Sequence, residues 1–536
     1  MCGILACFGP SPVDQRLFDQ NLAKLKHRGP DDTGKNDFKV GKFHLSVGHQ
    51  RLWIQGTKGP QPIVQHSTYL AANAEIYNAK QVLETQAFDT DCQAISHVLK
   101  DLSKDSSSFE VVHQLGLLDG VYSFVFVNKK EEIAVVARSV CGVMNLFYGL
   151  DQENRLYIAS ERKALLHSKT IRVFPPSRFL FLDLTKDLPT NIDDQLHRTD
   201  ALFSKTPSLN VCSKDHLYMY LELAVAKRLR SVKDFNMIGF LLSGGLDSSA
   251  VVTIAKKLYP KKKIRTFCIG LDPSAPDMAT ARRLAKDLGT DHTEYMFSIE
   301  EGTKVIPEVV RAVETVDKTT IRASTPMYIL IKKMKQDFPE IKVLMSGEGS
   351  DELMCGYLGF HDCPTVEAAH EWSTYLMEHI HMFDVLRAHQ SGMRHSVEVR
   401  VPFLDRYLVK YLRSVAPLSL VPMLGQEKYM LRQALKHLLP EYIVNRQKEQ
   451  FSDGVGYEWI DTLRKGQYRK MAFKQEELTD DLVVEPEQLQ IMDMFAYAFG
   501  LKHLKDISRQ MPQWTMLYTP SGDPSGRSSD KHIRYQ

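Results

Sequence analysis

Two short stretches of the chain bring together side chains that could do chemistry, and the first is at the N-terminus. The second residue is a cysteine, in the sequence MCGI. Removal of the initiator methionine, which is usual before a small residue, would leave a thiol and a free α-amine on Cys2. The amine, with an ordinary pKa of roughly 7.7–8.0, can take the proton of that thiol without a distant histidine. Cys2 is therefore a candidate nucleophile, with an incidental chain end as the alternative.

The second stretch is SGGLDSS at residues 243–249, between a strand-like and a helical segment. Its adjacent glycines let the backbone approach an anion closely. Ser248 and Ser249 can cap the following helix, whose free N–H groups and dipole attract a phosphate. Asp247 beside a polyphosphate makes chemical sense if Mg²⁺ lies between them. The lysine of a GxxxxGKS loop is absent, so this is not a phosphate loop of that kind, and a simple tight turn would not need the flanking serines and aspartate. The stretch resembles the SGGxDS pyrophosphate loop of ATP pyrophosphatases.

A second loop rich in glycine and serine, SGEGSDE at residues 346–352, follows a predicted strand at residues 342–345. Loops that follow neighbouring strands of a parallel sheet emerge at the same carboxyl edge, where ligands bind. We therefore expect Asp247 and Asp351 to approach one Mg²⁺ ion, with a solvated acidic loop as the alternative. Cationic segments at residues 425–432 and 446–452 could supply positive charge there or lie on the surface.

The composition is that of an ordinary globular protein with 536 residues, so two or more domains are expected. Its 68 basic and 65 acidic residues give a net charge of +3, which gives no reason to expect nucleic acid or an anionic membrane as a partner. No apolar run approaches the roughly 18 residues of a membrane span, and no basic leader precedes the apolar start. The eight cysteines are scattered without CxxC pairs, which favours a reducing, cytoplasmic location over a disulfide framework or zinc ribbon.

The secondary structure expected from the sequence changes along the chain and divides it into domains. Up to about residue 190, short apolar runs between polar turns, with a helix at residues 91–102, predict an α+β domain built on antiparallel sheets. Residues 191–209 have the polar, irregular sequence of a linker. Residues 210–518 predict an α/β domain with a parallel sheet, mainly helical after residue 364. The composition of residues 519–536 is typical of a disordered tail.

Individual elements can be placed from the pattern of apolar residues. The strands predicted in the first domain are residues 44–47, 68–72, 121–127, 133–137, 156–159 and 179–182. The strands predicted in the second are residues 237–242, 263–269 and 342–345, and the helices that alternate with them are residues 217–228, 248–258 and 278–288.

Taken together, the motifs resemble those of glutamine-hydrolysing asparagine synthetases over nearly the whole chain. The matching stretches include, in order, MCGI, HRGPD, NAEIYN, SERKAL, LLSGGLDSS, SGEGSDEL, EVRVPFLDR, EKYMLR and RQKEQFSDGVGY. This family joins a class II glutamine amidotransferase domain to a synthetase domain of ATP-pyrophosphatase type. The resemblance implies an N-terminal-nucleophile αββα sandwich, followed by an α/β domain of the adenine nucleotide α-hydrolase type.

The resemblance also implies a carbon–nitrogen ligase that works in two halves. Glutamine would be hydrolysed at Cys2 through a thioester, and the ammonia would attack β-aspartyl-AMP to give asparagine, AMP and pyrophosphate. The implied substrates are L-aspartate, L-glutamine and ATP, with Mg²⁺ as cofactor and a homodimer as a candidate assembly. A dry passage between the domains would keep the ammonia from becoming ammonium in bulk water.

The resemblance assigns roles to individual residues. Cys2 would be the nucleophile, and the Asn73 side chain and the Ala74 N–H would hold the oxyanion. The implied glutamine-binding residues are Arg51, Leu52, Trp53, Ile54, Gln55, Asn73, Ala74, Glu75 and Asp91. The implied ATP-binding residues are Leu242, Ser243, Gly244, Gly245, Asp247, Ser248, Ile269, Ser346 and Gly347. Asp247 and Asp351 would hold the metal, Lys428 would neutralise the departing pyrophosphate, and Glu348 would take a proton as ammonia attacks.

One departure from the family pattern concerns the first half-reaction. The family has Asn-Gly-Glu where this chain has Asn73, Ala74 and Glu75. If this position needs a positive φ, the methyl group of alanine costs roughly 1–2 kcal/mol and tilts the N–H donor. An ammonia-dependent synthetase with an impaired glutaminase is therefore one alternative. Others are a non-catalytic paralogue acting as a binding protein, and a β-lactam-forming synthetase, a type that lacks the N-terminal cysteine.

Overall fold

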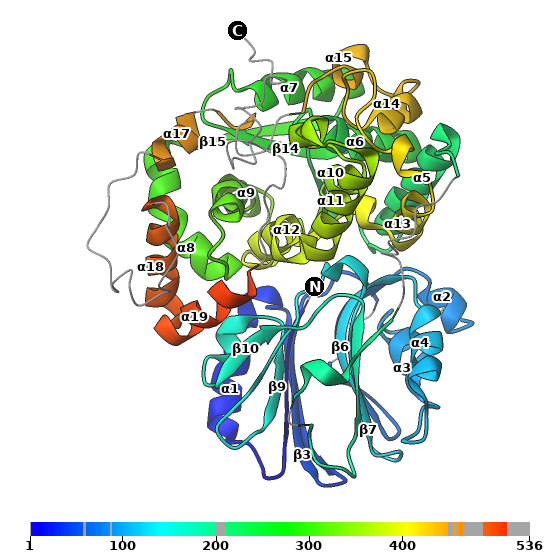
Figure 1. The fold of residues 1–536 in the computed structure, drawn as a ribbon, viewed down its shortest axis with the longest axis vertical. Helices are drawn as coiled ribbons and strands as arrows, with labels where there is room; N and C mark the ends of the chain where they lie inside the picture. Colours follow the sequence, from blue (N-terminus) through cyan, green and yellow to red (C-terminus); the bar gives the residue numbers. More distant parts are fainter. Residues whose placement is uncertain are drawn as a thin grey trace. The chain divides into compact units, whose positions relative to one another are not determined.

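The computed structural model describes residues 2–56, 61–85, 88–189, 191–199, 210–448, 454–456, 458–464 and 486–511 (Figure 1). The chain divides into two units. The first comprises Met1–Ala201, Met393–Val397 and Phe499–Gln510, and the second comprises Leu202–Gly392, Glu398–Ala498 and Met511–Gln536. The first unit therefore draws on segments from both ends of the chain.

The first unit contains two six-stranded antiparallel sheets. The strands of one sheet, in spatial order, are β10 (Thr170–Val173), β8 (Phe147–Leu150), β9 (Leu156–Ala159), β1 (Gly3–Gly9), β3 (Phe43–Arg51) and β2 (Asp32–Val40). The strands of the other are β12 (Leu196–Arg198), β11 (Arg178–Asp183), β7 (Ile133–Arg138), β6 (Gly120–Asn128), β5 (Thr68–Ile76) and β4 (Ile63–Gln65). The helices of the N-terminal segment are α1 (Gln15–Ala23), α2 (Ala79–Val82), α3 (Gln93–Leu99) and α4 (Ser108–Gly116).

Alternation of side chains along the strands produces four layers. Ile4 and Phe8 of β1 join the buried cluster that also contains Val125 of β6, so the two sheets face each other across it. On the opposite side of β1, Leu5 packs in a cluster with α1, because successive side chains of a strand point to opposite faces. Leu70 of β5 similarly packs with the residues of α3 and α4. The predicted αββα sandwich is thereby confirmed.

The strands predicted in the first domain all fall within observed strands. The structure adds the apolar strand β1 and several strands that are short or polar. β2 is the clearest addition, since its side chains are mostly exposed or half-buried and its sequence is polar. The segment predicted as a linker contributes β12 at its start, where Leu196 pairs with Leu180 of β11. Residues 200–209 lie outside the described residues.

The second unit contains a five-stranded parallel sheet. Its strands, in spatial order, are β15 (Asp291–Met296), β14 (Arg265–Gly270), β13 (Ile238–Leu241), β16 (Val343–Met345) and β17 (Glu398–Arg400). From β13 the chain first adds β14 and β15 on one side, and then β16 and β17 on the other. The strand order therefore reverses between β13 and β16, which is where ligands bind at the carboxyl ends of such sheets.

Helices surround this sheet and account for most of the later part of the chain. The longer helices before residue 364 are α5 (Lys214–Arg230), α6 (Leu246–Leu258), α7 (Pro276–Leu288), α8 (Ile299–Val313) and α9 (Lys318–Asp337), with the short α10 (Ser350–Leu353). Those that follow are α11 (Val366–His379), α12 (Asp384–Met393), α13 (Arg406–Arg413), α14 (Tyr429–Leu435), α15 (Glu441–Val444), α17 (Glu458–Arg464), α18 (Pro486–Phe499) and α19 (Leu501–Gln510). Among the described residues, no helix combines the length and apolar character needed to cross a membrane. The predicted tail, 519–536, lies outside the described residues.

Candidate active sites

Cys2 is buried immediately before β1 and is held from two sides. Its backbone nitrogen donates a hydrogen bond to Asn73 Oδ1 in β5 at 2.9 Å. Its carbonyl accepts from Arg28 Nε at 2.9 Å, and the same guanidinium is paired with Glu161 at 2.8 Å. The carbonyl oxygen of Leu52 lies 4.0 Å from the Cys2 Sγ. The structure thus brings together the predicted nucleophile and two of the predicted glutamine-binding residues.

Asn73 presents one unused hydrogen-bond donor beside Cys2. The residue is fully buried, and among the described residues its Nδ2 has no hydrogen-bond partner. Because Oδ1 accepts from the Cys2 nitrogen, the free end of the side chain must be the NH₂ group. A buried donor without a partner costs roughly 1–3 kcal/mol, and an oxygen of a ligand at this point would offset that cost. An oxyanion donor has this arrangement.

Ala74 does not need the left-handed backbone that glycine favours. It lies within β5 opposite Tyr122 of β6, and it is not one of the residues with a positive φ. Its methyl group is buried in the cluster that contains α3 and α4. The penalty that the sequence suggested for alanine at this position is therefore absent.

The other predicted glutamine-binding residues cluster around the end of β3 and the strand β5. Arg51, Glu75 and Asp91 are all at least nine-tenths buried. Gln55 Nε2 donates to Glu75 Oε2 at 2.9 Å, which ties the segment after β3 to β5. Asp91 Oδ2 accepts from the backbone nitrogen of Ile76 at 2.6 Å. Buried charged groups of both signs suit a zwitterionic ligand.

Trp53 and Ile54 complete the segment that follows β3. The backbone nitrogen of Trp53 donates to Asp31 Oδ2 at 2.8 Å, and its indole donates to the Gly56 carbonyl at 3.1 Å. Ile54 is buried, with 2% of its surface exposed. These contacts hold the segment in place, so that Gln55 lies beside Glu75.

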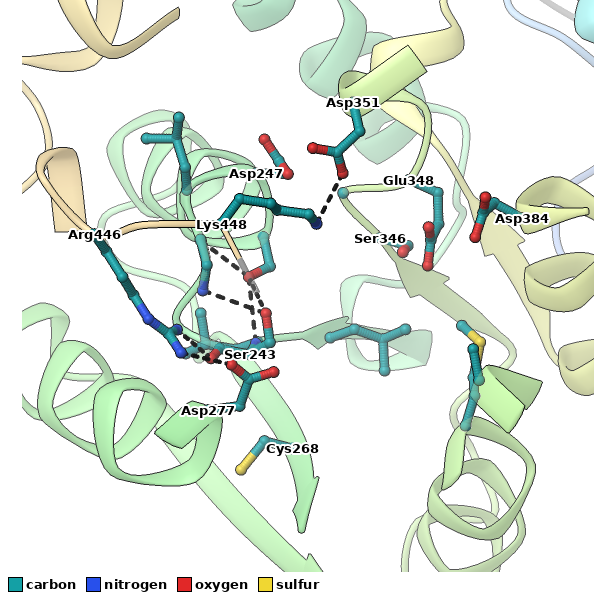
Figure 2. Close-up of a pocket in the computed structure, with 18 of the residues that line it drawn as sticks. Ser243, Asp247, Cys268, Asp277, Ser346, Glu348, Asp351, Asp384, Arg446 and Lys448 are labelled. Carbon is teal, nitrogen blue, oxygen red and sulfur yellow. Dashed lines mark hydrogen bonds and ion pairs between the residues drawn. The ribbon is translucent and has the colours of Figure 1, made fainter. Parts of the chain in front are cut away.

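The second unit has a cavity of about 1320 Å³, including the solvent at its mouth, at the carboxyl ends of β13, β14 and β16 (Figure 2). All of the predicted ATP-binding residues except Gly244 line it. Gly244 has a φ of +73°, and a Cβ there would lie 2.8 Å from the backbone nitrogen of Ala281. Gly244 therefore shapes the turn rather than the wall of the cavity.

The serines of the first loop do not cap the helix in the way that the sequence suggested. Gly245 is the N-cap of α6 and has no side-chain cap, because the helix begins at Leu246 and places Ser248 inside its first turn. The Ser248 hydroxyl instead donates to the Gly245 carbonyl at 3.2 Å and lies 3.1 Å from the Ser243 hydroxyl. The expectation of serine caps is wrong, and the first N–H groups of α6 are left without a side-chain cap, as an anion-binding helix terminus requires.

The second loop approaches the first closely because of Gly347. A Cβ at Gly347 would lie 2.8 Å from the backbone nitrogen of Ser248, so a larger residue would push the loops apart. Ser346 and Gly347 both line the cavity with Ser248. The two loops thus form one wall, as expected for a strand-order reversal between β13 and β16.

A lysine joins the two predicted metal ligands. Lys428 Nζ lies 2.7 Å from Asp247 Oδ2 and 2.7 Å from Asp351 Oδ1. Lys448 Nζ lies 2.8 Å from the other oxygen of Asp351 (Figure 2). Burial alone would raise the pKa of Asp351, but the two ammonium groups, Lys428 foremost, hold it well below its usual range. Two carboxylates that share one cation also suit Mg²⁺, which binds one or two carboxylates together with phosphate oxygens.

Glu348 lies at the cavity in a network that the sequence did not reveal. Arg387 donates to Glu348 Oε2 at 2.6 Å and is paired with Asp384 Oδ1 at 2.6 Å. The hydroxyl of Tyr357 lies 3.4 Å from Asp384 Oδ2 and donates to Glu352 at 2.5 Å. Burial raises the pKa of Glu348 despite Arg387, which lets this carboxyl hold or take a proton closer to neutral pH.

Arg387 and Asp384 could not have been found from the sequence. Their spacing of three residues on α12 is the one signal present, and such charge pairs are common on solvated helices. Both cationic segments do reach the cavity. Arg446 pairs with Asp277 at 2.7 Å and donates to the Ser243 carbonyl at 3.2 Å (Figure 2). Residues 449–453 lie outside the described residues.

The chain matches known families over both units. Residues 216–375 and 364–517 match the family described as asparagine synthase. The chain belongs to the asparagine synthase family. Residues 1–185 match the glutamine amidotransferase domain, so the match includes Cys2, begins just before β1 and ends after β11.

Several members of the asparagine synthase family are similar over most of their length. The chain is 34% identical to a probable glutamine-hydrolysing asparagine synthetase of Dictyostelium discoideum, covering 99% of each chain. It is 32% identical to the glutamine-hydrolysing asparagine synthetase B of Escherichia coli (strain K12), again covering 99% of each. It is 36% identical to the glutamine-hydrolysing asparagine synthetase 2 of Arabidopsis thaliana, covering 87% of this chain and 81% of the relative.

Proposed function

We propose that this chain synthesises asparagine from L-aspartate and ATP, with glutamine as the nitrogen donor. The observation that carries the proposal is the unpartnered Asn73 Nδ2 beside the N-terminal thiol, in a family member that also has a two-loop nucleotide cavity. We assign residues 1–190 to the glutaminase domain, residues 191–209 to the connection and residues 210–518 to the synthetase domain. Within the later two ranges, β12 and α19 belong to the first unit.

The glutaminase half uses the thiol and the α-amine of Cys2. The amine takes the thiol proton, and the sulfur attacks the side-chain amide carbon of glutamine. Asn73 Nδ2 and the Ala74 N–H stabilise the oxyanion, and one such donor contributes about 3–4 kcal/mol in other enzymes. The carbon–nitrogen bond then breaks, ammonia leaves with the transferred proton, and water hydrolyses the thioester.

Recognition of glutamine depends on the charged groups around Cys2. Arg51 binds the substrate carboxylate, because its guanidinium can offer two parallel N–H donors to the two oxygens. Glu75 and Asp91 bind the substrate ammonium. The segment that contains Leu52, Trp53, Ile54 and Gln55 forms the wall against which the substrate lies.

The synthetase half takes place in the cavity of the second unit. A carboxylate oxygen of aspartate attacks the α-phosphorus of ATP, which releases pyrophosphate and forms β-aspartyl-AMP. Asp247 and Asp351 would hold Mg²⁺, which neutralises phosphate charge when bound. Lys428 moves from these carboxylates to the leaving pyrophosphate, and a positive charge there stabilises the developing anion.

Ammonia completes the reaction at Glu348. As nitrogen attacks the activated carbonyl it acquires positive charge and must lose a proton. Glu348 takes that proton, and its raised pKa suits the transfer. Arg387 holds the carboxylate in place at 2.6 Å.

The remaining features fit a cytoplasmic enzyme. All eight cysteines are free thiols, which suits a reducing compartment. With a net charge of +3, neither nucleic acid nor a membrane is expected as a partner. A homodimer is the proposed assembly, which the mass of the protein in solution would test.

One assay tests the proposal. Asparagine and pyrophosphate are measured from aspartate and Mg·ATP with either glutamine or ammonium as the nitrogen source. Cys2→Ala should abolish the glutamine-dependent rate and spare the ammonium-dependent rate, whereas the control Cys363→Ala should retain both. Product with ammonium alone in the unmodified protein would reject glutamine dependence. No product with either source would favour a non-catalytic binding protein.

A further inference from the structure

A cysteine, a histidine and a glutamate converge on one face of the parallel sheet. In the pairing of β14 with β15, Cys268 lies opposite Glu294 and Thr266 lies opposite His292. Because side chains alternate along a strand, these four residues share one face of the sheet. A ligand atom of Cys268, one of His292 and one of Glu294 all lie within 4.8 Å of one another. No other such group of three is present among the described residues.

The distances between these atoms suit a tetrahedral metal ion. Cys268 Sγ lies 3.5 Å from His292 Nε2, which lies 3.7 Å from Glu294 Oε1. With metal–ligand bonds of roughly 2.0–2.3 Å, neighbouring ligands of a tetrahedral Zn²⁺ ion are separated by about 3.5 Å. The three atoms are therefore already near the spacing that the ion would impose.

The histidine is held in the orientation that a metal ligand needs. His292 Nδ1 lies 2.9 Å from the hydroxyl of Thr266, which leaves Nε2 directed toward Cys268 and Glu294. A hydrogen bond to the second ring nitrogen is the usual way in which proteins orient a metal-binding imidazole. Since Thr266 and His292 are register partners, the sheet itself fixes this contact.

The site is closed at one end and open at the other. Cys268 is 4% exposed, whereas the side chain of Glu294 is 25% exposed, so an ion can enter past the glutamate. Arg282 of α7 bonds both oxygens of Glu294, at 2.7 and 2.8 Å, and its own side chain is 47% exposed. Each carboxylate oxygen can accept a second interaction, so Glu294 can bind an ion while Arg282 remains nearby or moves into solvent.

We propose that Cys268, His292 and Glu294 bind Zn²⁺, with water as the fourth ligand. On binding, the sulfur–zinc bond forms as the thiol proton leaves to solvent, and the thiolate and carboxylate balance the charge of the ion. Sulfur and imidazole ligands select zinc over Mg²⁺, which prefers oxygen. The site is separate from the Mg²⁺ site at Asp247 and Asp351, and it does not depend on the proposed synthetase activity.

The proposed zinc site adjoins the nucleotide cavity. Cys268 lines that cavity together with Ser243 and Asp277 (Figure 2). Because neither His292 nor Glu294 lines the cavity, an ion held by these ligands would adjoin the cavity wall through Cys268.

Cobalt provides a direct test, because Co²⁺ replaces Zn²⁺ in such sites and a cobalt–thiolate bond absorbs in the near ultraviolet. The full-length protein is titrated with Co²⁺, and Zn²⁺ is then added to displace it. We expect a saturable charge-transfer band that Zn²⁺ removes. Cys268→Ala should abolish the band, and His292→Gln should weaken Co²⁺ binding by about tenfold or more.

Two kinds of variant separate this site from other thiols. Cys363→Ala and Cys2→Ala should keep the band. Loss of the band in Cys2→Ala would show that the metal binds the N-terminal thiol instead. Arg282→Gln should tighten Co²⁺ binding, because it removes a cation that competes for Glu294. No band in the unmodified protein, or a band that persists in Cys268→Ala, would overturn the proposal. Glu294→Gln should weaken Co²⁺ binding, and unchanged binding in that variant would exclude Glu294 as a ligand.

Discussion

At the scale of single residues, the side-chain amide of Asn73 offers an acceptor at one end and a donor at the other. Its Oδ1 accepts from the Cys2 nitrogen at 2.9 Å, and its Nδ2 is unpartnered among the described residues. Asn73→Asp keeps the acceptor and loses the donor. We expect the glutamine-dependent kcat to fall by about 10²–10³-fold, with the ammonium-dependent rate unchanged. Steady-state rates with the two nitrogen sources measure this, and Asn73→Ala, which loses both ends, should be no more active.

Ala74 provides a second test in the same strand. Because its backbone is extended, restoring glycine with Ala74→Gly should not increase kcat/KM for glutamine. Glycine inside a strand should instead lower the free energy of unfolding by about 0.5–1 kcal/mol. Glutaminase kinetics and urea unfolding measure the two effects. A tenfold gain in kcat/KM would show that the methyl group obstructs the oxyanion hole.

Lys428 and Mg²⁺ compete for the same oxygens. Lys428 bonds both Asp247 and Asp351, so Lys428→Met should leave two buried carboxylates that attract a divalent ion. We expect Mg²⁺ without ATP to raise the melting temperature of Lys428→Met more than that of the unmodified protein, while pyrophosphate release is lost. Lys436→Met, an exposed position, is the control. An equal response to Mg²⁺ in both proteins would argue against these carboxylates as its ligands.

At the scale of secondary-structure elements, a histidine links the two sheets of the first unit. His49 of β3 is fully buried and its Nε2 lies 3.0 Å from the Ala72 carbonyl in β5, so Nε2 must carry the proton. Burial lowers the pKa of His49 to about 3, although this hydrogen bond opposes the shift. The imidazole is therefore neutral in the folded protein over a range in which the unfolded chain is protonated.

This difference predicts how stability depends on pH. Since the folded pKa lies below the ordinary value of about 6.5, the contribution of His49 is complete above pH 6.5 and is lost as the pH falls toward 3. The contribution of His49 to the free energy of unfolding should fall by up to about 1.4 kcal/mol per pH unit. Urea unfolding of the unmodified protein and of His49→Gln between pH 5 and 8 measures it. The stability difference between the two should shrink as the pH falls, and a constant difference would contradict the assignment.

Local patterns in the sequence predicted the elements well and their contacts only in part. The strand–loop–helix at residues 237–258 and the strand at residues 342–345 were found because apolar runs meet glycine-rich loops there. The position of Lys428 between Asp247 and Asp351 depends on residues 181 and 77 positions apart, which no local pattern encodes. The same is true of Arg387 at Glu348. The site residues were predicted from the family resemblance. Their hydrogen-bond and ion-pair partners depend on tertiary packing and were not predicted.

At the scale of the whole molecule, the last described helix returns to the N-terminal unit. Lys502 of α19 donates to the Ser168 carbonyl at 2.6 Å, and Gln510 donates to the Ile171 carbonyl at 3.0 Å. These partners are 334 and 339 residues apart, so no local sequence pattern predicts this contact. The amidotransferase unit is thus completed by a segment that lies beyond the synthetase sheet in the chain.

This arrangement predicts that a change near the C-terminus weakens glutamine hydrolysis before ATP chemistry. Leu504 of α19 is fully buried, and Leu504→Ala should cost the first unit about 2–5 kcal/mol. On heating, glutaminase activity should be lost at a lower temperature than in the unmodified protein, while ammonium-dependent synthesis is lost at an unchanged temperature. Lys505→Ala, half-buried on the same helix, is the control. Parallel loss of both activities would show that α19 stabilises the second unit as well, since each site then depends on the same helix.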